Sequence, residues 1–309
     1  MEESETTTET TPTKKKAGFV AILGRPNAGK STLLNGFLGE RLAAVTPKPQ
    51  TTRDKILGVV HLPEGQIAFV DTPGFHKAKH ELNRWMVREA LSTLEDVNAV
   101  ILVVDVHTGF HEEDQMLLEE LVKTKLPIIL AINKIDKVHN KKKLFPIIDT
   151  WTPRHNFLAI VPISAKKEDG LELIIKELLP ILPEGEPILP DDEFTDRPAR
   201  FLVAEMIREQ VFLQTNQEIP YSCAVTIDKY QEPTTTKNTA HISATIHVER
   251  DSQKAIVIGK GGIMLKQIGT IARGHAETLL RQKVFLELFV RVEENWSENS
   301  KSMQKLGYK

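Results

Sequence analysis

The chain has 309 residues, enough for two domains that each bury their own core. Hydrophobic residues make up 40% and charged residues 27%, and no apolar run approaches the roughly 20 residues of a membrane span. The net charge is −2, and the single cysteine, Cys223, excludes an internal disulfide framework and suits a reducing compartment. The first 16 residues are rich in Thr, Glu and Lys without an apolar core, which predicts a disordered tail rather than a signal peptide.

The two parts of the chain differ in charge. From Arg197 to the end there are 16 Lys and Arg against 12 Asp and Glu, whereas the preceding part has 24 against 30. A basic carboxyl-terminal part is compatible with a nucleic-acid partner, although the excess is modest.

A phosphate-loop pattern lies near the amino terminus. Gly24-Arg25-Pro26-Asn27-Ala28-Gly29-Lys30-Ser31 has Gly, four free positions, Gly, Lys and Ser. The apolar run 19–23 predicts a buried strand before it, and a helix is predicted from Ser31 onward. In such a loop the backbone N–H groups point at the phosphates, Lys30 reaches the β- and γ-phosphates, and the Ser31 hydroxyl binds Mg²⁺. The alternative interpretation is a glycine turn between a strand and a helix, and the later motifs argue against it.

The order of elements predicts two domains and a linker. From residue 17 to 182 apolar strands such as 99–104 and 127–132 alternate with helices such as 112–123 and 170–179. This alternation predicts an α/β domain with a mostly parallel sheet around the phosphate loop. Residues 183–196 are rich in proline and acidic residues and predict a linker. Residues 197–309 follow the order helix, two strands, two helices and a strand, which predicts a smaller α+β domain.

Three short motifs follow predicted strands of the first domain. Asp71-Thr72-Pro73-Gly74 is alone a common turn, but after a phosphate loop its acid can hold Mg²⁺ through water and the Gly74 N–H can meet the γ-phosphate. Asn133-Lys134-Ile135-Asp136 offers a carboxylate that can bind both the N1–H and the N2 amino group of guanine, which adenine lacks. Ser164-Ala165-Lys166 can support the base from the other side. Together with the phosphate loop, these motifs predict a site for GTP and GDP.

The second domain contains Gly259-Lys260-Gly261-Gly262 between two predicted helices. A helix, a Gly-x-x-Gly loop and a second helix form the nucleic-acid clamp of KH domains, which holds about four nucleotides. The glycines admit a sugar-phosphate backbone, and Lys260 adds a positive charge. The bases would lie on an apolar face formed partly by Ile256, Ile258 and Ile263. The alternative is an ordinary turn between two helices.

These motifs give the sequence a family resemblance. Residues 18–170 resemble a small GTPase domain, and residues 18–309 as a whole resemble the Era family. The features that carry this resemblance are the phosphate loop, the acidic linker, Thr195-Asp196-Arg197-Pro198, the Gly-x-x-Gly loop and the segment from Trp296 to Tyr308. The resemblance implies a cytoplasmic GTPase that uses GTP and Mg²⁺ and binds the 3′ end of small-subunit ribosomal RNA during assembly of the ribosomal subunit. It also implies peripheral contact with the inner face of the cell membrane, and we expect a monomer.

The resemblance also assigns roles within the nucleotide site. The loop around Gln50-Thr51-Thr52-Arg53-Asp54 would be a switch that GTP orders, gating RNA binding, and one of its threonines would complete the Mg²⁺ shell. We favour Thr52, with Thr51 as the alternative; the loop could also be a solvated connection. Phe75 stands where Ras-like enzymes carry a water-orienting Gln, so hydrolysis is expected to be slow unaided or to rely on another group. In related GTPases an Asn at the place of Asn27 binds K⁺, and we hypothesise the same here; the alternative is that Asn27 only shapes the loop.

The predicted site residues fall into four groups. The catalytic residues are Asn27, Lys30, Thr52 and Gly74. The nucleotide-binding residues are Gly24, Asn27, Gly29, Lys30, Ser31, Thr32, Asp71, Asn133, Lys134, Asp136, Ser164, Ala165 and Lys166. Mg²⁺ is expected at Ser31, Thr52 and Asp71, and RNA at Ile258, Gly259, Lys260, Gly261 and Gly262.

Other classes of protein fit less well. A double-domain ribosomal GTPase would carry a second phosphate loop, and a tRNA-modifying GTPase would carry a carboxyl-terminal Cys, and this sequence has neither. The remaining alternative is an RNA-binding adaptor with a GTP-sensing but weakly hydrolytic site, which Phe75 keeps open. Phosphate release in a single turnover, with and without RNA, separates the adaptor from the enzyme.

Overall fold

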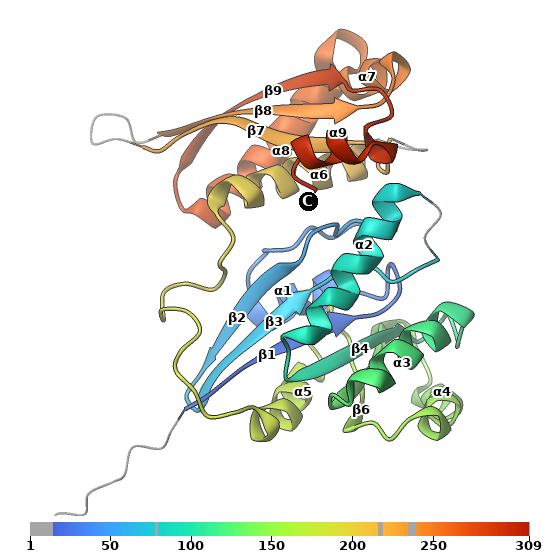
Figure 1. The fold of residues 1–309 in the computed structure, drawn as a ribbon. Helices are drawn as coiled ribbons and strands as arrows, with labels where there is room; N and C mark the ends of the chain where they lie inside the picture. Colours follow the sequence, from blue (N-terminus) through green and yellow to red (C-terminus); the bar gives the residue numbers. More distant parts are fainter. Residues whose placement is uncertain (1–14, 78–79, 216–218, 234–238, 309) are drawn as a thin grey trace, which may run out of the picture.

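The computed structural model describes residues 15–77, 80–215, 219–233 and 239–308, which form two stacked domains (Figure 1). Of the predicted tail, residues 1–14 lie outside the described part, whereas Lys16 already begins a strand. The strands are β1 (Lys16–Leu23), β2 (Ile56–Leu62), β3 (Gly65–Asp71), β4 (Ala99–Asp105), β5 (Ile128–Asn133), β6 (Ala159–Pro162), β7 (Ala224–Gln231), β8 (Thr239–Val248) and β9 (Lys283–Val292). The α-helices are α1 (Lys30–Leu38), α2 (Glu81–Ser92), α3 (Glu112–Thr124), α4 (Leu144–Trp151), α5 (Leu171–Leu178), α6 (Ala199–Gln214), α7 (Asp251–Ile258), α8 (Ile263–Leu280) and α9 (Ser300–Lys305).

The first domain is built on a six-stranded sheet in the order β2-β3-β1-β4-β5-β6. Only β2 runs antiparallel to its neighbour, so the prediction of a mostly parallel sheet is confirmed. Alternate residues of β1 enter two different cores, because side chains on a strand point to opposite faces. Val20 and Ile22 pack with α1 and α5 on one face, whereas Ala21 and Leu23 pack with α2, α3 and α4 on the other. Burial on both faces explains why the central strands read as continuous apolar runs.

This topology gathers the predicted motifs at one edge of the sheet. The phosphate loop follows β1, the segment from Thr72 follows β3, and the segment from Lys134 follows β5. Because these three strands are parallel, their carboxyl ends and the loops that follow them meet on the same side of the domain.

The segment predicted as a linker lies along the first domain. The Pro183 carbonyl accepts from the Ala17 N–H at 3.0 Å, and the Phe194 carbonyl accepts from the Val59 N–H of β2 at 2.8 Å. Between them, Gln66 Nε2 donates to the Leu189 carbonyl at 2.7 Å. These backbone contacts fix the path by which the chain reaches α6.

The second domain is a three-stranded sheet in the order β7-β8-β9, with helices on one face, which confirms the predicted α+β class. Strand β7 is antiparallel to β8, and β8 is parallel to β9. The inner residues of β8 pack against α6, α7 and α8 around Ile207, Ile242 and Ile268. The segment Asp251–Leu280 is long and apolar enough to be a candidate membrane span, but it consists of α7 and α8 separated by the turn at residues 259–262 and contributes to this core.

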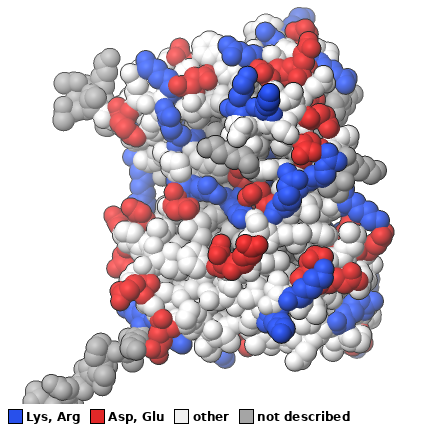
Figure 2. All heavy atoms as spheres, viewed as in Figure 1, with Lys and Arg blue, Asp and Glu red and all other residues white. Residues whose placement is uncertain are grey.

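Aromatic residues at the carboxyl terminus join the two domains. Trp296 and Tyr308 stack at 5.5 Å, and Tyr308 meets Trp85 of α2 edge to face at 5.3 Å. Leu82, Met86 and Met303 complete this cluster, and each is less than a tenth exposed. Figure 2 shows a row of Lys and Arg side chains along the junction of the domains on this face.

Candidate functional site

The phosphate loop leaves the amino-terminal N–H groups of α1 open. Gly29 caps α1 with a left-handed φ of 102° and no side-chain hydrogen bond. A Cβ at Gly29 would lie 2.2 Å from Asn133 Nδ2, so only glycine fits there. The buried Lys30 Nζ donates to the carbonyls of Gly24 and Arg25, both at 3.1 Å. The open helix end and the ammonium group together favour an anion such as a nucleotide phosphate.

A cluster of hard oxygen atoms lies behind this loop. Asp71 Oδ2 accepts from Ser31 Oγ at 2.6 Å and from Thr52 Oγ1 at 3.2 Å, and the two hydroxyl oxygens are 2.6 Å apart. Asp71 Oδ1 is buried and has no hydrogen-bond partner among the described residues. Burial raises the pKa of Asp71 to about 6, although the charge of Lys30 and these hydrogen bonds lower it. Two hydroxyl groups and a carboxylate with one unpaired oxygen fit the preference of Mg²⁺ for oxygen ligands.

The two candidate threonines differ in their surroundings. The Thr51 hydroxyl donates to the Lys48 carbonyl at 2.9 Å and lies 2.6 Å from the Thr46 hydroxyl. The Thr52 hydroxyl instead points at Ser31 and Asp71. The geometry therefore favours Thr52 as the residue that completes the metal shell.

The Asn133 side chain forms hydrogen bonds that connect the two predicted base-binding loops to the phosphate loop. Its Oδ1 accepts from the N–H groups of Lys134, at 2.7 Å, and Ala165, at 3.0 Å, while its Nδ2 donates to the Ala28 carbonyl at 2.8 Å. Ser164 Oγ donates to Asp136 Oδ1 at 2.7 Å. The structure thus brings Asp136 and the loop after β6 together, as a guanine-binding carboxylate with a support requires.

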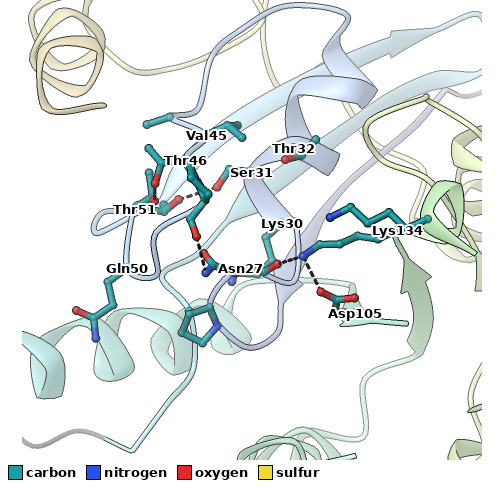
Figure 3. Close-up of a pocket in the computed structure, with 17 residues that line it drawn as sticks. Asn27, Lys30, Ser31, Thr32, Val45, Thr46, Gln50, Thr51, Asp105 and Lys134 are labelled. Carbon is teal, nitrogen blue, oxygen red and sulfur yellow. Dashed lines mark hydrogen bonds and ion pairs between the residues drawn. The ribbon is translucent and has the colours of Figure 1, made fainter. Parts of the chain in front are cut away.

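The cleft between these loops has a volume of about 450 Å³. Figure 3 shows Lys134 extending along it, with Nζ paired to Asp105 at 2.6 Å and donating to the Asn27 carbonyl at 2.6 Å. Thr32 and Gly74 also line the cleft, whereas Asp136 and the exposed Lys166 lie outside its lining.

Sequence reasoning missed some of the residues that line the cleft. These are Ala44, Val45, Thr46, Pro47, Asp105 and Lys137. Asp105 could have been found, because it ends a buried strand at the ligand edge of the sheet. Lys137 directly follows the Asn133–Asp136 motif, and the others belong to a loop that carries no pattern of its own.

Phe75 and Asn27 bear on hydrolysis. Phe75 is 4% exposed and belongs to the core that the sheet shares with α2, α3 and α4, and it does not line the cleft. Asn27 has a left-handed φ of 63°, and its Nδ2 donates to the Pro47 carbonyl at 3.0 Å. No hydrogen bond of Asn27 Oδ1 occurs among the residues that the structure describes, so this oxygen is available to a cation.

The loop from Glu40 to Lys55, which we call the switch loop, lies on α6 of the second domain. Arg41 Nη2 donates to both carboxylate oxygens of Glu209 at 2.8 Å, and the Val45 N–H donates to Glu209 Oε1 at 2.7 Å. Lys48 Nζ donates to the carbonyls of Phe212 and Thr215 at the end of α6.

Arg53 of the switch loop is enclosed by the second domain. It is 1% exposed and donates to the carbonyls of Cys223 at 2.7 Å and of Pro220 and Tyr221 at 3.0 Å, and to Tyr308 Oη at 3.0 Å. The ring centroids of Trp296 and Tyr308 lie 5.7 and 5.8 Å from its guanidinium carbon. A charge buried this deeply is stabilised only because several acceptors surround it.

The turn at residues 259–262 presents its backbone to solvent. Gly259, Gly261 and Gly262 have φ values of 70°, 61° and 79°, and a Cβ at Gly261 or Gly262 would meet nothing within 4 Å. Lys260 is exposed, and Ile256 and Ile263 on either side of the turn are 46% and 69% exposed, so apolar side chains flank the turn at the surface.

Next to this turn lies a groove of about 340 Å³ between α8 and β9. Its lining residues are Gly262, Leu265, Lys266, Gly269, Thr270, Arg273, Leu286 and Leu288. Lys266 and Arg273 supply positive charge, and their spacing of seven residues on one helix was the signal available in the sequence. An apolar groove with cations beside open glycine backbone suits a single nucleic-acid strand.

A guanine-nucleotide cleft joined to this helix–turn–helix clamp defines a GTP-binding protein of the phosphate-loop class with a KH domain. Residues 19–134 match the family described as 50S ribosome-binding GTPase, and residues 218–297 match the KH domain. The GTPase Era of Syntrophus aciditrophicus is 47% identical over 293 residues, which is 95% of each chain. The GTPase Era of Geobacter sp. is 48% identical over 295 residues, covering 96% of this chain and 98% of the relative.

Solved structures agree. Era in complex with MgGDPNP and nucleotides 1506–1542 of 16S ribosomal RNA matches with a TM-score of 0.91 at 40% identity, over 95% of this chain and 99% of that one. A variant of Aquifex aeolicus Era bound to GDP·AlF4⁻ matches with the same values. The chain belongs to the Era family of GTPases.

Proposed function

We propose that this chain hydrolyses GTP with Mg²⁺ and binds the 3′ end of small-subunit ribosomal RNA through its KH domain, with the nucleotide gating the RNA. Membership of the Era family and the joined cleft and clamp support the two activities. The single observation that supports the gating is the position of Thr52 and Arg53, which are adjacent in the chain but belong to different sites.

Different residues of the cleft would bind Mg²⁺, the phosphates and the guanine base. Ser31, Thr52 and Asp71 would hold Mg²⁺, which neutralises charge on the β- and γ-phosphates. Lys30, freed from the Gly24 and Arg25 carbonyls, would bind the same phosphates. Asp136, oriented by Ser164, would select guanine.

A K⁺ ion at Asn27 would supply positive charge to the transition state, where Phe75 provides no group that orients water. The Asn27 Oδ1 atom, which has no hydrogen bond among the described residues, and the buried Phe75 ring, which offers no polar group to the cleft, support this proposal. Hydrolysis should be faster in KCl than in NaCl at equal ionic strength, and Asn27→Ala should remove the difference. Equal wild-type rates in the two salts would exclude a specific K⁺ site.

A physical route connects the cleft to the RNA groove. Successive Cα atoms lie about 3.8 Å apart, so a metal that pulls on Thr52 also moves Arg53. Arg41 of the same loop contacts His275 of α8 through Nη1 and Nε2 at 3.2 Å. Helix α8 also carries Arg273, which lines the groove.

This route predicts the direction of the coupling. In the described structure Thr52 Oγ1 lies 3.2 Å from Asp71 Oδ2 while Arg41, Lys48 and Arg53 contact the second domain, so the two arrangements are compatible. If GTP binds more tightly when the switch loop is docked on the second domain, then RNA that binds this docked arrangement must raise the affinity for GTP, and GTP must raise the affinity for RNA. We therefore expect GTP to tighten RNA binding.

The test is the affinity for a single-stranded RNA with the sequence of the 3′ end of small-subunit ribosomal RNA. It is measured at fixed salt with GDP and with a non-hydrolysable GTP analogue. Affinity at least fivefold tighter with the analogue supports gating. Equal affinities would show that the two domains act independently, and binding in neither state would refute the RNA function itself.

The peripheral membrane contact and the monomeric state remain proposals that rest on the family resemblance and on the sequence expectation, respectively. Co-flotation with anionic vesicles tests the membrane contact, and sedimentation equilibrium tests the monomer.

A further inference from the structure

The sheet of the second domain has an outer face that carries exposed aromatic rings. Along β9, Leu286 and Leu288 turn toward the helices and line the groove, whereas Phe285 and Phe289 point to the opposite face. Phe285 is 49% and Phe289 55% exposed. Helix α8 lies behind the three strands in Figure 1, so it does not cover this outer face.

The surroundings of the two rings resemble a platform for nucleic-acid bases. The ring of His241 on β8 lies 5.2 Å from that of Phe285, which widens the aromatic surface. Five charged residues lie on this outer face of β7 and β9: the cations Lys229, Lys283 and Arg291 and the anions Asp228 and Glu287. Asp228 already accepts a hydrogen bond from Thr245 at 2.6 Å. Cations interspersed with aromatic rings are the composition of single-strand binding surfaces.

The described part of the chain leaves this platform uncovered. The carboxyl-terminal segment contacts the sheet at its other end, where Ala224 of β7 packs with Trp296 and Tyr308. Strand β9 pairs only with β8 among the described residues, so it forms the edge between the groove and the outer face. Two large apolar side chains left exposed on one strand indicate a binding surface rather than a core.

We propose that the RNA strand held in the groove continues across the edge of β9, and that its bases stack on Phe285 and Phe289. This inference rests on the proposed RNA function and adds a second contact to it. A Gly-x-x-Gly clamp holds about four nucleotides, whereas the RNA solved with the Era relative spans nucleotides 1506–1542. The occupant is single-stranded RNA because the platform shares β9 with the groove, and because stacking on aromatic rings accepts any base.

The test compares two RNAs on the full-length chain at fixed salt. One RNA is five nucleotides long and fills only the groove, and the other carries six further nucleotides at each end. Phe285→Leu and Phe289→Leu keep an apolar side chain but remove the aromatic face. Stacking contributes about 1–3 kcal/mol per base, so each variant should lose about fivefold or more in affinity for the long RNA and none for the short one.

Matched variants separate stacking from other effects. Phe145→Leu removes a similarly exposed ring, 64% accessible, from α4 of the first domain and should change neither affinity. Glu287→Gln removes the negative charge between the two rings and should tighten the long RNA only. A 2-aminopurine base placed outside the groove segment should lose fluorescence on binding the wild type, and less of it on binding the leucine variants.

Three results would overturn the proposal. Unchanged affinity of both leucine variants for the long RNA would show that the outer face does not bind RNA. Equal loss for both RNAs would place the effect in the groove or in folding. If the wild-type chain bound the two RNAs equally tightly, the platform would fail while the proposed RNA function stood.

Discussion

At the scale of single residues, the candidate metal site is marked by a buried oxygen atom that has no hydrogen-bond partner among the described residues. Asp71 is fully buried, and both hydroxyls near it address the same carboxylate oxygen, which leaves Oδ1 without a partner among the described residues. A buried carboxylate oxygen without a hydrogen bond is costly. A cation at this position would remove that cost and make the charged carboxylate favourable. The structure therefore fits a protein whose cleft is completed by its ligand.

The two neighbouring threonines allow a sharp test of this site. Thr52→Val keeps the shape of the side chain but removes the hydroxyl that faces Ser31 and Asp71. We expect the Mg²⁺-dependent gain in affinity for a GTP analogue to fall about 10- to 100-fold, because hydrogen bonds and ligands to charged groups contribute about 1.5–3 kcal/mol. A titration of Mg²⁺ with a fluorescent GTP analogue measures the loss.

Thr51→Val is the matched control. It removes only the contacts to Thr46 and to the Lys48 carbonyl, so we expect a loss of about 1 kcal/mol in stability and little change in the Mg²⁺ dependence. The assignment would be wrong if the two variants exchanged these effects.

At the scale of elements, the sequence correctly predicts those strands and loops whose structure follows from their own residue pattern. The strands β1, β4 and β5 are apolar runs because both faces are covered, and the loops after them contain glycines and acids that a nucleotide site requires. The pairing of Asp136 with Ser164 also follows the expectation that the two loops support one base. Period, burial and motif agree in these segments.

Helix α6 shows why the remainder could not be predicted. Glu205, Arg208 and Glu209 are each 7% exposed or less, although charged residues in a helix normally indicate a solvated face. Here one side of the helix packs on the sheet of its own domain, while Glu209 on another side receives Arg41 from the switch loop. No pattern within α6 indicates a partner more than 160 residues away in the sequence.

The turn between α7 and α8 allows a test of the RNA clamp as an element. Lys260→Asp with Gly261→Asp places two negative charges in the Gly-x-x-Gly loop, at exposed positions where a Cβ at Gly261 meets nothing within 4 Å. Asp tolerates the left-handed φ of 61° better than most residues, so folding should persist. We expect RNA affinity to fall more than tenfold at fixed salt, measured by fluorescence anisotropy.

Two readouts control this experiment. The GTP-hydrolysis rate without RNA and the melting temperature should stay close to wild type, because the loop is remote from the cleft. Lys123→Asp, on an exposed face of α3, makes the same Lys-to-Asp exchange outside the second domain and should leave RNA binding unchanged. Retained RNA affinity in the double variant would contradict the assignment of the clamp.

At the scale of the whole molecule, cations of the switch loop hold the domains together. Arg41, Lys48 and Arg53 each donate to acceptors of the second domain, and two of the three bind backbone carbonyls. Carbonyls at a helix end and in a turn have no partner of their own, so an incoming cation satisfies groups that would otherwise be exposed on separation. The contact between the domains therefore involves the same loop that places Thr52 beside Ser31 and Asp71 in the nucleotide cleft.

Arg53 is the residue at which this coupling should be measured. Arg53→Ala leaves the carbonyls of Pro220, Tyr221 and Cys223 without their donor, and breaking a buried charged contact of this kind costs about 3–5 kcal/mol. We expect the ratio of RNA affinities between the GTP-analogue and GDP states to fall toward one, and the radius of gyration in the GTP-analogue state to increase. Arg53→Lys should restore the ratio only in part, because an ammonium group lacks the planar fork that reaches several acceptors at once.

Arg154→Ala, on the far side of the first domain over the Phe110 ring, should preserve both values. An unchanged affinity ratio in Arg53→Ala would separate the nucleotide from the RNA and refute the gating.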